Sequence, residues 1–152
     1  MPCSRGYLND SLKAGTRACI KRQFSQSLLI VEMRIHYHDE KQEYYFKEGC
    51  YILEMWNDPD DADVSIARAR VEPGKETRRH RLMGIAERHL ILSGRGEARV
   101  GNNPPVLVAP GSVVVIPPGV DQSIHNTGSE DLVFLAICTP RFQPSAYSDT
   151  ES

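Results

Sequence analysis

Short apolar runs alternate with turn residues along the chain from about residue 49 to residue 139. The runs are rich in β-branched and aromatic side chains, which favour strands, and no long segment shows the 3.6-residue period of a helix. They cover residues 50–56, 64–71, 90–92, 106–108, 113–116 and 132–137. Turn-forming residues separate them at 57–61, 73–74, 93–96, 109–111 and 117–119, and the segment 93–96 is typical of a β-hairpin. This pattern predicts an all-β domain, a sandwich or barrel of many short strands.

The two ends of the chain lack this pattern. Residues 1–32 are basic, show no period of two and faintly resemble an organelle transit peptide. We prefer to interpret them as an N-terminal extension that is poorly structured or forms a short helix, and Met33 is an alternative start of the protein. We expect the folded domain over residues 33–142 and a loose, polar tail over residues 143–152.

Two spaced motifs give a more specific signal than the strand pattern. The first motif runs Gly74-x5-His80-x-Leu82-x4-Glu87-x6-Gly94. The second motif runs Gly111-x5-Pro117-x-Gly119-x2-Gln122-x3-Asn126. In order and in every spacer they resemble the two motifs of the cupin superfamily, Gly-x5-His-x-His-x3-4-Glu-x6-Gly and Gly-x5-Pro-x-Gly-x2-His-x3-Asn. The resemblance covers roughly residues 64–137 and implies a small antiparallel, jelly-roll-like cupin β-barrel.

The resemblance also implies a metal site, although this chain departs from the family at two ligands. In cupins three histidines and the glutamate hold one divalent metal inside the barrel, and here Leu82 and Gln122 stand in place of the second and third histidines. The predicted metal ligands are therefore His80, Glu87 and, as a weaker amide-oxygen donor, Gln122. Iron, manganese, nickel and zinc are the candidate ions, and Leu82 is predicted to form an apolar wall against a bound molecule.

A third histidine lies close to the motif glutamate. His89 follows Glu87 by two residues, so both side chains point to one face of a strand, with Cα atoms roughly 6.5–7 Å apart. With His80 they would form a two-histidine, one-carboxylate metal site. Alternatively, His89 fills the barrel interior beside a bound ligand, and we favour this second interpretation.

Other charged and imidazole side chains are predicted to lie outside the site. A His-x-His pair at positions 36 and 38 is interpreted as part of a solvated edge strand, and strand alternation from Gln122 points His125 outward. Arg68 and Arg70 share one strand face, which we expect to be the outer one, paired with acidic residues at 72, 76 and 97. An inward arginine would instead favour an anionic ligand.

Composition removes several classes of function. The 18 basic and 20 acidic residues nearly balance, with a formal net charge of −2, which argues against a nucleic-acid partner. The four cysteines are scattered without a Cys-x-x-Cys pair, which argues against a zinc knuckle and favours a reduced setting. No apolar stretch is long enough to span a membrane, so we expect a cytoplasmic protein that does not bind membranes.

Three functions remain open on these residues. The first is a metal-dependent enzyme acting on a small molecule, with His80 and Glu87 holding the ion. The second is a metal-free module that binds or senses a small ligand without catalysis. The third is a metal-free enzyme in which Glu87 is a general base beside His80. The resemblance also leads us to expect a homodimer, formed through edge strands.

Overall fold

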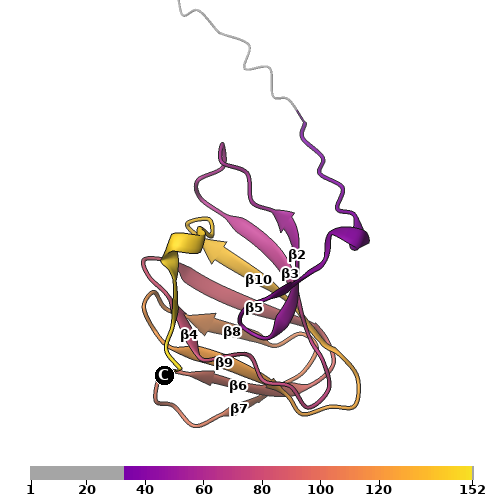
Figure 1. Ribbon diagram of the computed structural model, residues 1–152, viewed down its shortest axis with the longest axis vertical. Helices are drawn as coiled ribbons and strands as arrows, with labels where there is room; N and C mark the ends of the chain where they lie inside the picture. Colours follow the sequence, from indigo (N-terminus) through magenta and orange to yellow (C-terminus); the bar gives the residue numbers. More distant parts are fainter. Residues whose placement is uncertain (1–32, 152) are drawn as a thin grey trace, which may run out of the picture. The chain divides into compact units, whose positions relative to one another are not determined.

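The protein folds into two antiparallel β-sheets. The structure is a computed structural model that describes residues 33–151 (Figure 1). The six-stranded sheet has the order β1-β2-β3-β10-β5-β8, and the five-stranded sheet has the order β11-β4-β9-β6-β7. The strands are β1 (Tyr44–Phe46), β2 (Cys50–Trp56), β3 (Ser65–Val71), β4 (His80–Leu82), β5 (Ala86–Ser93), β6 (Gly96–Val100), β7 (Val106–Val108), β8 (Val113–Ile116), β9 (Gln122–Asn126), β10 (Leu132–Thr139) and β11 (Tyr147–Asp149). The prediction of an all-β fold of short antiparallel strands is confirmed.

Strand alternation places the apolar core between the two sheets. Along β5, the side chains of Glu87, His89 and Ile91 are buried, while the residues between them are half-buried. Ile91 and Leu132 of one sheet belong to the same buried cluster as Ile124 of the other sheet. These apolar side chains hold the sheets face to face, and the polar inward residues of β4, β5 and β9 lie beside that core.

The turn at residues 93–96 is not the β-hairpin that its sequence predicted. It carries the chain from β5 in one sheet to β6 in the other, because β5 pairs with β10 and β8 while β6 pairs with β9 and β7. Gly94 has φ +79°, and a Cβ there would lie 2.5 Å from the carbonyl oxygen of Asp131. The glycine is therefore needed for a close crossing between sheets rather than for a two-strand turn.

The C-terminal segment differs from the loose tail predicted for residues 143–152. It forms a short 3-10 helix, η2 (Pro144–Ala146), and then β11, which pairs with β4 so that Tyr147 lies opposite Leu82. The Arg78 guanidinium donates to Asp149 over 2.8 Å, and Thr150 N–H donates to the Arg79 carbonyl. The segment thus completes the five-stranded sheet through backbone pairing and an ion pair that local sequence patterns do not reveal.

The first described residues, from residue 33 to residue 42, also differ from the predicted structure. Residues 33–39 form no strand, so the edge strand predicted around His36 and His38 is wrong. A short 3-10 helix, η1 (Glu40–Gln42), follows instead, capped by the side chain of Asp39. The extension predicted over residues 1–32 lies outside the described residues. Within residues 33–151, no helix has the length and apolar character needed to cross a membrane.

Arg68 and Arg70 lie on the outer face of β3, as expected, but with partners other than those predicted. Arg68 donates to Glu40, and Arg70 donates to both Glu43 and Asp131. These contacts join η1 and the segment before β10 to β3. The acidic partners come from distant parts of the chain, whereas the predicted partners were chosen by their closeness in sequence.

Candidate functional site

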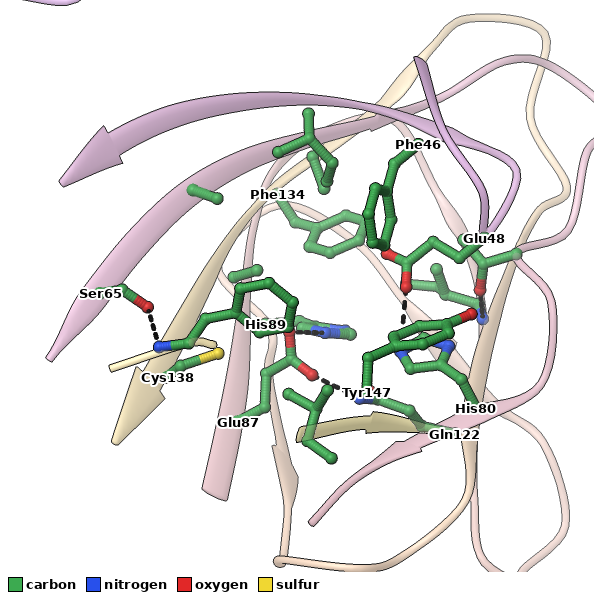
Figure 2. Close-up of a pocket in the computed structure, with 18 of the residues that line it drawn as sticks. Phe46, Glu48, Ser65, His80, Glu87, His89, Gln122, Phe134, Cys138 and Tyr147 are labelled. Carbon is green, nitrogen blue, oxygen red and sulfur yellow. Dashed lines mark hydrogen bonds and ion pairs between the residues drawn. The ribbon is translucent and has the colours of Figure 1, made fainter. Parts of the chain in front are cut away.

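A cavity with both apolar and polar walls lies between the two sheets (Figure 2). The six-stranded sheet contributes Glu87 and His89 from β5, and the five-stranded sheet contributes His80 and Leu82 from β4 and Gln122 from β9. All five residues predicted for the site therefore line one cavity. Their roles as metal ligands or ligand-binding residues stay predictions.

The first carboxylate–imidazole pair is formed by Glu87 and His89, which alternation places on the inner face of β5. Glu87 Oε1 lies 3.3 Å from His89 Nε2, and the Gln122 amide N–H donates to the other carboxylate oxygen. Burial opposes ionisation of Glu87, but attraction to His89 and the hydrogen bonds from His89 and Gln122 outweigh it and lower the pKa of Glu87. His89 also packs against the Phe134 ring, with centroids 4.5 Å apart.

The second pair is formed by Glu48 and His80. Glu48 Oε2 lies 3.2 Å from His80 Nε2, and His80 Nδ1 lies 2.8 Å from the Arg78 carbonyl oxygen. A carbonyl only accepts hydrogen bonds, so Nδ1 carries the proton and Nε2 faces the cavity. Burial raises the pKa of Glu48, and the nearby Glu87 raises it further, against the attraction of His80.

Glu48 was not found by sequence reasoning. It lies on the tight turn between β1 and β2, where Gly49 takes φ +91° and the Glu48 carbonyl accepts from Arg78 N–H over 2.7 Å. The Cys50 thiol donates to the Glu48 carboxylate over 3.4 Å. Glu48 precedes both cupin-like motifs and pairs with a residue 32 positions later, so no local spacing marks it.

Tyr147 is a second site residue that the sequence did not reveal. It comes from β11 and its ring stacks on His80, with centroids 5.1 Å apart and planes 22° apart (Figure 2). Burial, with the nearby carboxylate of Glu48, raises the pKa of Tyr147 to about 12, so its hydroxyl keeps its proton at neutral pH. Its hydroxyl oxygen is buried and has no hydrogen-bond partner in the described chain.

The predicted metal ligands are arranged as partners of other side chains. His80 Nε2 faces Glu48, and the two oxygens of Glu87 face His89 and Gln122. Across residues 33–151, no three His, Cys, Asp or Glu side chains converge as a metal site requires. A metal ion held by His80 and Glu87 would therefore have to displace the Glu48–His80 and Glu87–His89 contacts.

The fold and the cavity define a class of protein: a small barrel of two facing antiparallel sheets, with buried polar side chains lining an internal cavity. A family model described as a cupin domain matches residues 67–138. The chain therefore contains a cupin domain, as its two motifs predicted.

One curated relative and several solved structures are similar to the chain. An oxalate-binding protein of Thermotoga maritima is 37% identical over 72 residues, a match that spans 47% of this chain and 59% of that protein's length. A protein with a double-stranded β-helix domain from Klebsiella pneumoniae has a TM-score of 0.63 at 18% identity, over 80% of this chain and all of that one.

Two enzymes of known structure also share the fold. The Streptomyces nucleoside dehydratase Pac13, solved with uridine in variant forms, has a TM-score of 0.63 at 14% identity, over 78% of this chain and 92% of that one. Oxalate decarboxylase of Lactobacillus farciminis has a TM-score of 0.61 at 20% identity, over 72% of this chain and 33% of that one. These likenesses show the fold alone.

Proposed function

We propose that the protein binds a small molecule inside the barrel and transfers protons to and from it without a metal ion. One observation carries this proposal: two carboxylate–imidazole pairs, Glu48–His80 and Glu87–His89, line the same buried cavity. Acid–base chemistry needs a proton donor and a proton acceptor held against one substrate.

The opposite pKa shifts of the two glutamates assign those roles. Glu87 has a lowered pKa, so it is ionised at neutral pH and acts as the acceptor, with His89 beside it. Glu48 has a raised pKa, so it retains a proton more readily and acts as the donor, beside His80. When the surroundings of two titratable groups shift their pKa values in opposite directions, one group can act as an acid and the other as a base. A proton taken by Glu87 from one atom is balanced by one given by Glu48 to another atom of the same molecule.

The relatives support a small-molecule ligand. One is named as binding oxalate, and another was solved with uridine bound. Cupin barrels support many reactions, so the fold by itself does not select among them. We therefore propose the type of step, proton transfer, and leave the substrate to be identified by screening.

A metal-binding function is the second candidate, and one observation favours it. His80 donates through Nδ1 to the Arg78 carbonyl, an orientation that also directs a metal-binding imidazole, and Gln122 Oε1 is buried without a partner. His80, Glu87 and Gln122 would then hold the ion. A third candidate is ligand binding or sensing without catalysis.

One experiment separates the three candidates. The chain is purified without chelator, its metal content is measured, and the protein is incubated in D₂O with uridine and a panel of small hydroxy ketones while NMR follows C–H exchange and elimination. We expect turnover of at least one compound by metal-free protein. Turnover only after iron, manganese, nickel or zinc is restored would favour the metal candidate. Binding of a compound without any exchange would favour a sensing module.

We also propose a cytoplasmic homodimer. The edge strand β8 exposes Val113 and Val115, which are 56% and 60% exposed, and a second copy would cover them. We expect light scattering of the full chain to give twice the monomer mass of 17.1 kDa. A monomer at micromolar concentration would contradict this proposal.

A further inference from the structure

Two buried polar atoms of the cavity have no hydrogen-bond partner within residues 33–151, and together they indicate which groups a ligand must offer. Gln122 is 2% exposed, and its amide N–H₂ is directed at the Glu87 carboxylate, so its oxygen is left as an acceptor without a donor. The Tyr147 hydroxyl is likewise unpartnered. Buried polar groups are nearly always hydrogen-bonded, so a ligand is the natural source of these two missing bonds.

The charges of the cavity disfavour an anion. Its lining includes the carboxylates of Glu48, Glu54 and Glu87, and no arginine or lysine is among the lining residues of the described chain. Both lining histidines already face a carboxylate. An anionic ligand would therefore enter a poorly solvated space beside the ionised Glu87, with no arginine or lysine of the described chain in the lining to balance its charge.

The nearby basic side chains are engaged elsewhere. Arg78 pairs with Asp149, and Arg79 and Arg81 pair with Asp121. Lys47 lies over the Tyr147 ring, 4.1 Å from its centroid, and is not part of the lining. Among residues 33–151, no arginine lines the cavity to favour an anionic ligand.

The remaining walls suit a flat, apolar group. The aromatic rings of Phe46 and Phe134 line the cavity (Figure 2). The ring of Phe142 and the apolar side chain of Leu82 also line it. Rings of this kind stack against planar ligands and cover their apolar surface. A planar body with one polar end therefore matches the cavity better than a compact dianion does.

We propose that the cavity selects an uncharged, planar molecule bearing an amide, which donates its N–H to Gln122 Oε1 and accepts from the Tyr147 hydroxyl. An amide carries both the donor that Gln122 Oε1 lacks and an acceptor for the Tyr147 hydroxyl, whereas a carboxylate has no donor for Gln122. Tyr147 and Gln122 are thus specificity-determining residues. This inference rests on the proposed function only in that the cavity binds a small molecule.

Benzamide and benzoate test it, because they have nearly the same shape and differ in charge and donor. Binding to the metal-free full chain is measured by calorimetry at pH 7. We expect benzamide to bind at least tenfold more tightly than benzoate. Benzoate binding as tightly or more tightly would overturn the inference and leave small-molecule binding intact. Binding of neither compound would also overturn it, while turnover in the D₂O screen tests the proposed function separately.

A variant pair tests the role of Tyr147. Tyr147→Phe keeps the ring that stacks on His80 and removes the hydroxyl, so we expect benzamide affinity to fall about three- to tenfold, as loss of one hydrogen bond implies. Tyr45→Phe is the matched control, because Tyr45 is 62% exposed and does not line the cavity. Equal benzamide affinities in the two variants would overturn the assignment of Tyr147.

Discussion

Replacing Glu87 by glutamine should lower proton-transfer activity by about 10²–10⁴-fold, the usual contribution of a general base. The substitution keeps the shape of the side chain and an oxygen that accepts from Gln122, but it removes the ionised group that faces His89. The readout is the rate of C–H exchange or elimination with whichever compound the D₂O screen identifies.

The matched control for Glu87→Gln is Glu72→Gln, since Glu72 is exposed and does not line the cavity. Unfolding midpoints of both variants show whether the fold persists. A Glu87→Gln protein that is folded and retains more than a tenth of the activity would contradict the role of Glu87 as the proton acceptor.

The Glu48→Gln variant should also lose activity. Its effect on the pH dependence of stability should be opposite in sign to that of Glu87→Gln. Because its folded-state pKa is raised, Glu48 favours folding at low pH, and this contribution declines as the pH rises from the ordinary glutamate pKa to the raised value. Glu87 has the opposite sign: its contribution is present above the ordinary pKa and is lost as the pH falls through the lowered one. Glu48→Gln should therefore remove only the decline of stability toward higher pH.

Replacing Asn126 by alanine should destabilise the fold by about 3–5 kcal/mol. Asn126 is fully buried, and its amide N–H₂ donates to the carbonyls of Val71 and Glu130, each over 2.8 Å. Its side-chain oxygen accepts from Gly128 N–H over 2.9 Å. Removing the side chain leaves buried backbone groups without partners and opens a gap where β9 ends.

Urea unfolding followed by the fluorescence of Trp56, the single tryptophan, measures this loss. Asn103→Ala is the control, because Asn103 is exposed and its side chain donates a single hydrogen bond, to the carbonyl of Val100 over 2.9 Å. We expect the control to lose less than about 1 kcal/mol. A loss of similar size in both variants would show that the buried network of Asn126 contributes little.

The motif spacings predicted more of the site than any other sequence feature. Gly94 lies at a close crossing where a Cβ would clash with the Asp131 carbonyl, and the Asn126 side chain makes three hydrogen bonds in a buried network. Between these two positions, the motif spacers determine which residues of β4, β5 and β9 face inward, and His80, Glu87 and Gln122 line one cavity.

What the sequence did not reveal depends on contacts between distant segments. Glu48 lies on a turn outside the motifs, and Tyr147 lies on a strand that forms only by pairing with β4. The predicted metal ligands came from the motifs, which do not include Glu48, the side chain that faces His80 Nε2 in the structure. Local patterns predict which residues share one face of a strand, but they do not predict which sequence-distant residues contact that face.

The most direct test of the account is the titration of the two buried glutamates. Carbon-13 NMR of glutamate-labelled protein follows each side-chain carboxyl against pH, with Glu48→Gln and Glu87→Gln assigning the signals. We predict that Glu87 titrates below, and Glu48 above, the ordinary glutamate value, which makes one a base and the other an acid in the same cavity. Two ordinary pKa values, or the reverse order, would contradict the proposed proton-transfer site.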